Sequence, residues 1–109
     1  MVERFSITLR VDEGEALGEL LLRGEFDYSA TQGVIDTAAS ALTGDSVRRL
    51  VVDLTHVTFI DSSGVGALVN IYRMSRATGA MAVLRDPTPA TAAILRITSV
   101  DQLFVDEAS

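Results

Sequence analysis

The residues best suited to chemistry lie in the middle of the chain, where Asp61-Ser62-Ser63-Gly64 separates a strand-like segment from a helix-like one. A serine at a helix N-terminus lies among backbone N–H groups that lack partners, at the positive end of the helix dipole. Such a position tolerates an anion, so the domain could carry a phosphate there without unfolding. Local physics alone favours a simpler interpretation, in which Asp61 or Ser62 is an N-cap residue.

Asp53, His56 and Ser62 include the three residue types of a hydrolytic triad. The segment around Ser62 lacks the first glycine of the G-x-S-x-G nucleophile elbow, however. The sequence contains no Lys and no Cys, which excludes Schiff-base, P-loop-lysine and thiol chemistry. His56 is the single histidine, which excludes a multi-histidine metal site within one chain. We therefore predict no enzymatic activity, no catalytic residue, no metal and no cofactor.

Composition describes an acidic chain of the size of one domain. The 109 residues are 48% hydrophobic, and nine basic against fifteen acidic residues give a net charge of −6. That balance disfavours direct nucleic-acid binding, which needs clustered positive charge. No segment approaches the roughly 20 apolar residues of a membrane span, and the N-terminus lacks the pattern of a signal peptide. We expect a cytoplasmic protein.

The first half of the chain predicts a hairpin and a helix. Residues 5–11 alternate between apolar and polar side chains, and residues 17–22 form a second strand candidate, so the two segments predict an antiparallel hairpin. Ser29 and Gln32 have the spacing of a capping box for a helix that ends at Gly44. Apolar residues at helical spacing give this helix one buried stripe: Val34, Ile35, Ala38, Ala41 and Leu42.

The second half alternates strands and helices. The apolar run in residues 47–54 predicts a strand buried on both faces, and residues 80–84 predict another. Between them, a second amphipathic helix runs to Thr78 and is stopped by Gly79. Thr88-Pro89 is typical of an N-cap followed by the first residue of a third helix, and residues 103–105 suggest a short last strand.

These elements together predict one α/β domain over residues 1–109. Its mixed β-sheet would open with the antiparallel hairpin, followed by helices that alternate with strands and by right-handed parallel crossovers.

Three segments carry a resemblance to a known family. F-I-D-S-S-G-V-G-A-L at residues 59–68, preceded by V-V-D-L, resembles the signature of the STAS domain found in bacterial anti-sigma factor antagonists. G-E-F-D at residues 24–27 is similar to the family's G-E-L/I-D segment, and D-P-T-P-A-T-A-A-I-L at residues 86–95 fits the approach to the third helix. The resemblance extends from about residue 5 to residue 105.

The resemblance implies a phosphorylation switch at Ser62. In antagonists of this family the serine directly after the aspartate is phosphorylated by a partner that is both anti-sigma factor and serine kinase. The unphosphorylated antagonist binds that partner and releases a sigma factor, and a metal-dependent serine phosphatase resets it. Ser63 is the second candidate for phosphorylation. The implied partner-binding residues are Asp27, Asp61, Ser62, Ser63 and Gly64.

Alternatives remain open at several positions. Stand-alone STAS proteins also serve as subunits of membrane transporters or of stress-sensing complexes. Asp27 could merely cap the turn before the first helix, and Asp53 is expected to hold the following loop by hydrogen bonds. Family antagonists commonly end in a C-terminal helix, whereas only residues 106–109 follow the strand predicted here. We therefore expect that helix to be absent or removed.

Overall fold

A four-stranded mixed sheet with strand order β1-β2-β3-β4 forms the centre of the structure, a computed structural model that describes residues 4–108. The hairpin β1-β2 is antiparallel, whereas β3 runs parallel to both β2 and β4. The elements in chain order are β1 (Phe5–Asp12), β2 (Leu17–Phe26), α1 (Tyr28–Leu42), β3 (Arg49–Ile60), α2 (Ser62–Thr78), β4 (Met81–Arg85), α3 (Pro89–Ile97) and α4 (Val100–Ala108). The structure confirms the predicted fold class.

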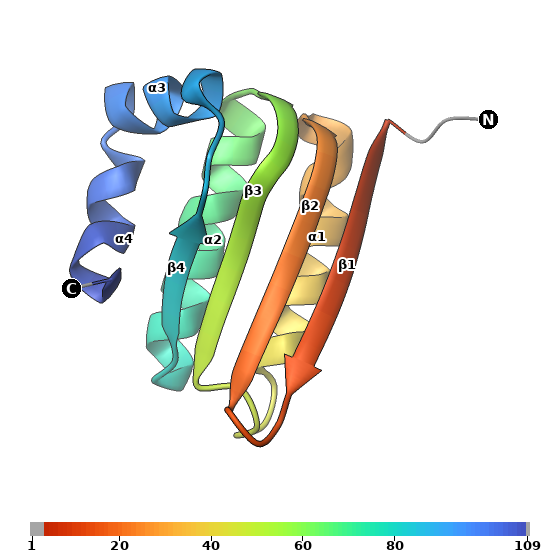
Figure 1. Ribbon diagram of the computed structural model, residues 1–109, viewed down its shortest axis with the longest axis vertical. Helices are drawn as coiled ribbons and strands as arrows, with labels where there is room; N and C mark the ends of the chain where they lie inside the picture. The colour runs from red at the N-terminus through yellow and green to blue at the C-terminus, as the bar shows by residue number, and fades with distance from the viewer. Residues whose placement is uncertain (1–3, 109) are drawn as a thin grey trace.

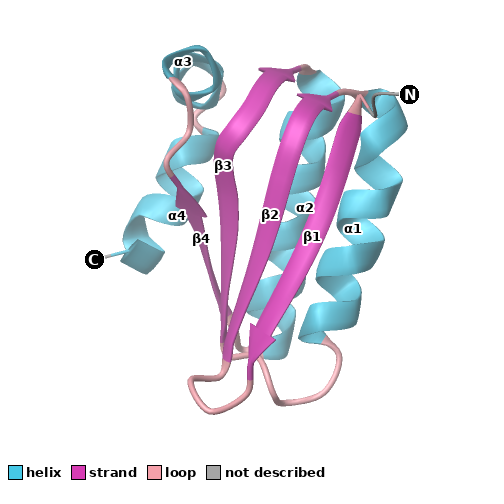
Figure 2. Cartoon of the chain, turned by 45° about the vertical axis from the view of Figure 1, so that its right-hand side comes forward, coloured by secondary structure: helices cyan, strands magenta, loops and turns pink. Residues whose placement is uncertain are grey.

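Helices α1 and α2 lie side by side against one face of the sheet (Figures 1 and 2). Alternate residues of β2 point toward them, because side chains on a strand alternate between its faces. Leu20, Leu22 and Phe26 are at most 2% exposed, and Leu68 and Ile71 of α2 are fully buried in the same core. The sheet and the two helices therefore form two layers around one hydrophobic core.

Strand β3 is longer than residues 47–54, and the prediction of its end was wrong. Its pairing with β2 shifts twice, between Leu21 and Arg23 and between Gly24 and Glu25, which is the signature of β-bulges. At the first shift the Thr55 N–H donates to Asp53 Oδ1 over 2.9 Å. The bulges let a strand with irregular hydrophobic spacing continue to Ile60. Asp53 consequently lies within β3 and not at its end.

The capping box predicted at Ser29 is also wrong, because α1 begins earlier. Asp27 is the N-cap, and its carboxylate accepts a hydrogen bond from the Ser29 N–H. The Gln32 side chain instead donates to Asp36 Oδ1 over 2.8 Å. Asp27 is the N-cap because it is the single residue between the end of β2 and the start of α1, so no longer loop separates the strand from the helix.

The predicted end of α2 and start of α3 are confirmed, whereas α1 ends at Leu42, with Thr43 and not Gly44 as its C-cap. Gly79 ends α2 in the left-handed conformation, with φ of 80°, which glycine adopts without steric cost. Thr88 is the N-cap of α3, its side chain accepts from the Thr91 N–H, and Pro89 occupies the first turn.

The C-terminal segment departs most from expectation. The strand predicted over residues 103–105 is instead part of α4, so the C-terminal helix that we expected to be absent is present. Val100 and Phe104, four residues apart, are 5% and 3% exposed, so they share one buried helical face. This face packs against β4 and α3. The buried residues of this segment therefore recur at helical spacing, and not at every second position as in a strand.

Candidate functional site

Helices α1 and α2 both begin at the same end of the sheet, where the neighbouring strands β2 and β3 finish (Figure 2). Phe26, the last residue of β2, accepts a hydrogen bond over 3.4 Å from the backbone N–H of Asp61. This bond places the start of α2 beside the start of α1. The carboxyl ends of parallel strands are where α/β folds commonly bind their ligands.

Asp61 is the N-cap of α2, as the simpler interpretation of the motif proposed. Its side chain accepts from the Gly64 N–H over 3.0 Å, and its carbonyl accepts from the Val65 N–H over 3.0 Å. Ser62 is then the first residue of the helix, and it is exposed. Among the described residues its hydroxyl group has no hydrogen-bond partner. An exposed, unbonded hydroxyl at this position is accessible to a modifying enzyme.

Gly64 is required by packing. A Cβ atom at this position would lie 2.5 Å from the Phe26 carbonyl oxygen and 2.7 Å from Ile60 Cγ1. The missing side chain lets the first turn of α2 pack directly on the ends of β2 and β3. At Gly66, by contrast, a Cβ would meet nothing within 4 Å. Gly64 is buried, and its predicted contact with a partner stays a prediction.

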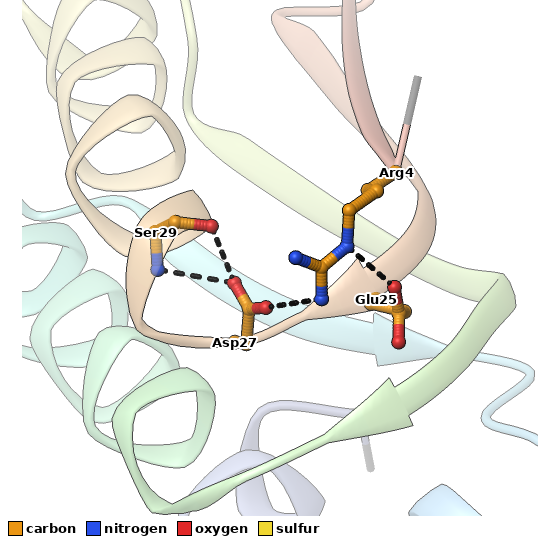
Figure 3. Close-up of polar contacts among 4 residues, drawn as sticks. All are labelled: Arg4, Glu25, Asp27 and Ser29. Carbon is orange, nitrogen blue, oxygen red and sulfur yellow. Dashed lines mark hydrogen bonds and ion pairs between the residues drawn. The ribbon is translucent and has the colours of Figure 1, made fainter. Parts of the chain in front are cut away.

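Asp27 sits at the centre of a small polar network (Figure 3). Its Oδ1 accepts from the Ser29 N–H over 3.0 Å and from the Ser29 hydroxyl over 2.7 Å, and its Oδ2 accepts from Arg4 Nη2 over 3.1 Å. The same guanidinium donates through Nε to Glu25 Oε2 over 2.8 Å. These contacts fix the Asp27 carboxylate at the entrance to α1.

The network also sets the charge of its members. The Ser29 hydroxyl is the main cause that lowers the pKa of the Asp27 carboxyl, and Arg4 adds to the effect. Glu25, through its hydrogen bond and its charge, raises the pKa of Arg4. The Arg4 side chain is 71% exposed, so its ion pairs contribute little to stability. Asp27 is therefore shown to be a helix cap, while its predicted contact with a partner stays untested.

The three residue types of a hydrolytic triad are not assembled. Asp53 accepts hydrogen bonds from the Thr55 N–H over 2.9 Å and from Arg85 Nη1 over 3.4 Å. Burial works against ionisation of this carboxyl, but the bonds from Thr55 and Arg85 outweigh it and lower its pKa. His56 is exposed on β3, and within residues 4–108 no hydrogen bond joins Asp53, His56 and Ser62. Asp53 holds the bulge of β3, much as its predicted hydrogen-bonding role implied.

The sequence analysis did not identify two exposed aromatic residues at this end of the sheet as candidates for partner binding. Tyr28, which directly follows the cap of α1, is 78% exposed, and Phe59 near the end of β3 is 50% exposed. Exposed aromatic side chains are typical anchors of protein interfaces. The available signal was their position, since each lies within two residues of a capping aspartate.

The part of the chain that the structure describes contains no group of three or more His, Cys, Asp or Glu residues arranged to hold a metal ion. Within the same residues, no helix has the length and apolar character needed to cross a membrane.

The STAS domain family model matches residues 8–108. The sequence is 34% identical over 83 residues to the STAS-domain containing protein PA14_20770 of Pseudomonas aeruginosa, which covers 76% of this chain and 80% of that protein. It is 25% identical over 85 residues to the anti-sigma F factor antagonist of Lysinibacillus sphaericus, which covers 78% of this chain and 73% of that protein.

Solved structures of an anti-sigma factor antagonist share the fold. SpoIIAA in its unphosphorylated form superposes with a TM-score of 0.78 at 21% identity, covering 90% of this chain and 84% of that one. The phosphorylated form of SpoIIAA, a Bacillus cell fate determinant, gives a TM-score of 0.71 at 21% identity, covering 90% and 87%. At this level of identity the likeness is one of fold.

Proposed function

The chain belongs to the STAS domain family, as its motifs predicted, and we propose that it is an anti-sigma factor antagonist switched by phosphorylation of Ser62. In this proposal the unphosphorylated form binds an anti-sigma factor that is also a serine kinase, and a sigma factor is released. The observation that carries the proposal is the exposed, unbonded Ser62 hydroxyl at the first position of α2, directly after the capping Asp61.

The local charge supports a switch that works by repulsion. Phosphorylation adds a charge of about −1.5 to −2 at pH 7. The carboxylates of Asp27 and Asp61 cap the two neighbouring helices, so a phosphate on Ser62 would join two negative groups at this end of the sheet. A partner surface that docks on these carboxylates without the phosphate would have to accommodate a much larger negative charge with it. Binding is therefore the property most sensitive to the modification.

The start of α2 supports a fold that survives the modification. The Gly64 and Val65 N–H groups are taken by Asp61, whereas the N–H groups of Ser62 and Ser63 precede the first intrahelical bond. A phosphate at the helix N-terminus is stabilised by such free donors and by the helix dipole. The folded state of the phosphorylated protein should consequently be as stable as that of the unmodified one.

The exposed residues around Ser62 supply the means to bind a partner. Gly66 lies one helical turn after Ser62 on the same face of α2, and a Cβ atom there would meet no described residue outside the adjoining backbone of α2 within 4 Å. Because glycine has no side chain, another protein can approach the backbone of α2 closely at this position. Tyr28, the first residue of the neighbouring helix α1, provides exposed apolar area at the same end of the sheet. The proposal also includes a metal-dependent serine phosphatase, which removes the phosphate and restores binding. We further propose that the protein acts in the cytoplasm and makes no direct contact with nucleic acid.

The first test is phosphorylation in a soluble lysate of the source organism with ATP and phosphatase inhibitors, read by intact mass and site mapping. We expect one phosphate on Ser62, its loss in Ser62→Ala and its retention in Ser63→Ala. A phosphate that persists in Ser62→Ala would move the switch to another residue. The absence of any label, in a lysate that labels a known kinase substrate, would refute the switch.

The second test separates binding from folding. The labelling kinase, once isolated, is titrated with wild type, Ser62→Asp and Ser46→Asp. Ser46 is exposed in the segment between α1 and β3, so its substitution adds the same charge away from the site. We expect Ser62→Asp alone to lose affinity, with its unfolding free energy within about 0.5 kcal/mol of wild type. Equal binding by Ser62→Asp and wild type would contradict the repulsion argument.

A further inference from the structure

Strand β1 forms an edge of the sheet that no other described part of the chain covers. Figure 1 shows α4 beside β4 at the opposite edge, and no described element beyond β1. Natural proteins commonly protect such an edge with proline, lysine, a β-bulge or a covering segment. β1 contains neither proline nor lysine, and it pairs with β2 over eight consecutive residues without a register shift. It is therefore long and regular enough to pair with another strand.

The backbone groups of this edge point outward at every second residue. The Glu25 N–H donates to the Arg4 carbonyl over 2.9 Å, so these two residues form a hydrogen-bonded pair of the antiparallel hairpin. Hydrogen-bonded and non-hydrogen-bonded pairs alternate along an antiparallel ladder, so the even-numbered residues of β1 direct their N–H and C=O groups toward β2. The odd-numbered residues direct theirs away from the sheet, where no described residue bonds to them: Phe5, Ile7, Leu9 and Val11.

The same four outward residues leave apolar area uncovered at the edge. Their side chains lie on the face of β1 that meets α1, because side chains on a strand alternate between its faces. Phe5, Ile7 and Leu9 are only partly buried against the core, and Val11 is 45% exposed. An open groove of about 540 Å³ lies between the first residues of β1 and Gly33 of α1. The hydrophobic core is therefore incompletely covered on this side.

A second copy of β1 is complementary to this edge. In antiparallel pairing of the strand with itself, the register centred on Thr8 joins all four outward residues in hydrogen-bonded pairs. Its apolar pairs are Phe5 with Val11 and Ile7 with Leu9. A shift by one residue would turn the apolar face of one copy away from the core of the other, so it is disfavoured.

The charged residues select the same register. It places Arg4 of each copy opposite Asp12 of the other, in a non-hydrogen-bonded pair, where side chains approach most closely. A shift by two residues in one direction would place Arg4 opposite Arg10, and like charges directly opposite each other are destabilising. The opposite shift would place the apolar Phe5 opposite Glu13, in the turn after β1.

The helices beneath the two hairpins would also fit together. α1 contacts both β1 and β2, and Figure 1 shows it behind these strands. Neighbouring strands lie about 4.8 Å apart, so the axes of two α1 helices would lie about 10 Å apart across the junction. Packed helices have axes about 8–10 Å apart. Ser29 and Gly33, which line the groove on this side of α1, are small enough to allow that approach.

We propose that two copies of this chain form a dimer through β1, with a twofold axis at Thr8 and one continuous eight-stranded sheet. The outward residues of the two copies exchange backbone hydrogen bonds, and their apolar side chains cover each other at the edge. Arg4 donates two hydrogen bonds within its own chain, to Glu25 and Asp27, and its guanidinium has further donors for Asp12 of the second copy. This inference is independent of the phosphorylation of Ser62, and its test requires no kinase.

The first test is sedimentation equilibrium of the full chain from about 10 μM to about 1 mM. About 150 mM salt screens the net charge of −6 on each chain. We expect the average mass to rise with concentration from that of one chain toward twice that value. Amide hydrogen exchange at both ends of the range locates the contact, because protection should rise at the four outward residues and not at the even-numbered residues between them, which β2 already protects. A monomer at 1 mM, or a dimer without this alternating protection, would overturn the proposal.

Exchange of charges tests the register. Asp12→Arg would bring two arginines together at each end of the junction, and Arg4→Asp would bring two aspartates together. We expect each variant alone to dimerise at least about tenfold more weakly than wild type. An equimolar mixture of the two variants restores opposite charges at both ends and should form a heterodimer.

The matched control is Asp45→Arg, which makes the same change of charge at an exposed position between α1 and β3. It should dimerise like wild type. Circular dichroism of each variant shows whether it is folded. Unchanged dimerisation of Asp12→Arg, or no heterodimer in a mixture of the two folded variants, would refute the pairing of Arg4 with Asp12.

Discussion

Replacing Gly64 with alanine should damage the packing of α2 in a way that replacing Gly66 does not. Both glycines lie in the first turns of α2, two residues apart, so both substitutions bring a similar gain in helix propensity. They differ in what the new methyl group meets. At Gly64 it would lie 2.5 Å from the Phe26 carbonyl oxygen and 2.7 Å from Ile60 Cγ1, and at Gly66 it would meet nothing within 4 Å.

The expected magnitudes follow from these distances. Alanine stabilises a helix interior by about 1 kcal/mol relative to glycine, so Gly66→Ala should gain about that much. Overpacking a tight contact costs about 1–3 kcal/mol, and the backbone oxygen of Phe26 cannot rotate away as a side chain could. Gly64→Ala should therefore lie between no net change and a loss of about 2 kcal/mol. The gap between the two variants, about 1–3 kcal/mol, isolates the steric term.

Urea unfolding followed by circular dichroism measures this gap directly. With a slope of about 1–3 kcal/mol per molar urea, the two midpoints should differ by roughly 1 M. The slope itself should be the same in wild type and both variants, because the surface exposed on unfolding hardly changes. Gly64→Ala as stable as Gly66→Ala would refute the close approach of α2 to the end of β2. The same pair also tests partner docking, since Gly66→Ala should weaken binding of the kinase although it stabilises the fold.

Two further predictions concern carboxylates whose pKa values are lowered. For Asp27, hydrogen bonds from Ser29 hold the pKa below its usual 3.8, so its contribution to stability is present at higher pH and is lost as pH falls through the folded-state pKa. The difference in unfolding free energy between wild type and Asp27→Asn should accordingly shrink on acidification from pH 7, as measured by urea titrations at several pH values; a constant difference would contradict this. Asp53→Ala removes the acceptor of the Thr55 N–H and one partner of Arg85. It should lower the unfolding free energy by about 1–2 kcal/mol in the same assay. An unchanged unfolding free energy would mean that the bulge of β3 does not need the bond between Asp53 and Thr55.

Much of the fold could be predicted because the hydrophobic periodicity and the residues that end helices and strands indicate the same elements. The alternation in β1, the apolar run in β3 and the stop at Gly79 each reflect local physics that the final structure keeps. The C-terminus was misjudged because Leu103, Phe104 and Val105 form a short apolar run, and such a run does not distinguish a strand from a buried helix. What decides the matter is packing of Val100 and Phe104 against β4 and α3, a tertiary contact.

The local position of the candidate residues was predictable from the sequence, and their tertiary contacts were not. The motif identified Asp61 as a capping candidate and placed Ser62 at the start of a helix, and both placements hold. The contact between α2 and the end of β2 joins positions nearly forty residues apart, so no local pattern could reveal why Gly64 is a glycine. The exposure of Tyr28 was equally hidden, because an aromatic residue at a helix start is as compatible with a core as with a surface.

The arrangement of the two helix starts explains how one group could govern binding while leaving the fold unchanged. Each helix is capped by its own aspartate, so neither depends on the Ser62 hydroxyl for its first turn. Stability at this end comes from the caps, from the bond between Phe26 and Asp61, and from the close packing at Gly64. The exposed Ser62 hydroxyl lies next to the capping Asp61 in the chain and takes part in none of these contacts. A residue so placed can change its charge at little cost to folding, which is the physical condition that a phosphorylation switch must satisfy.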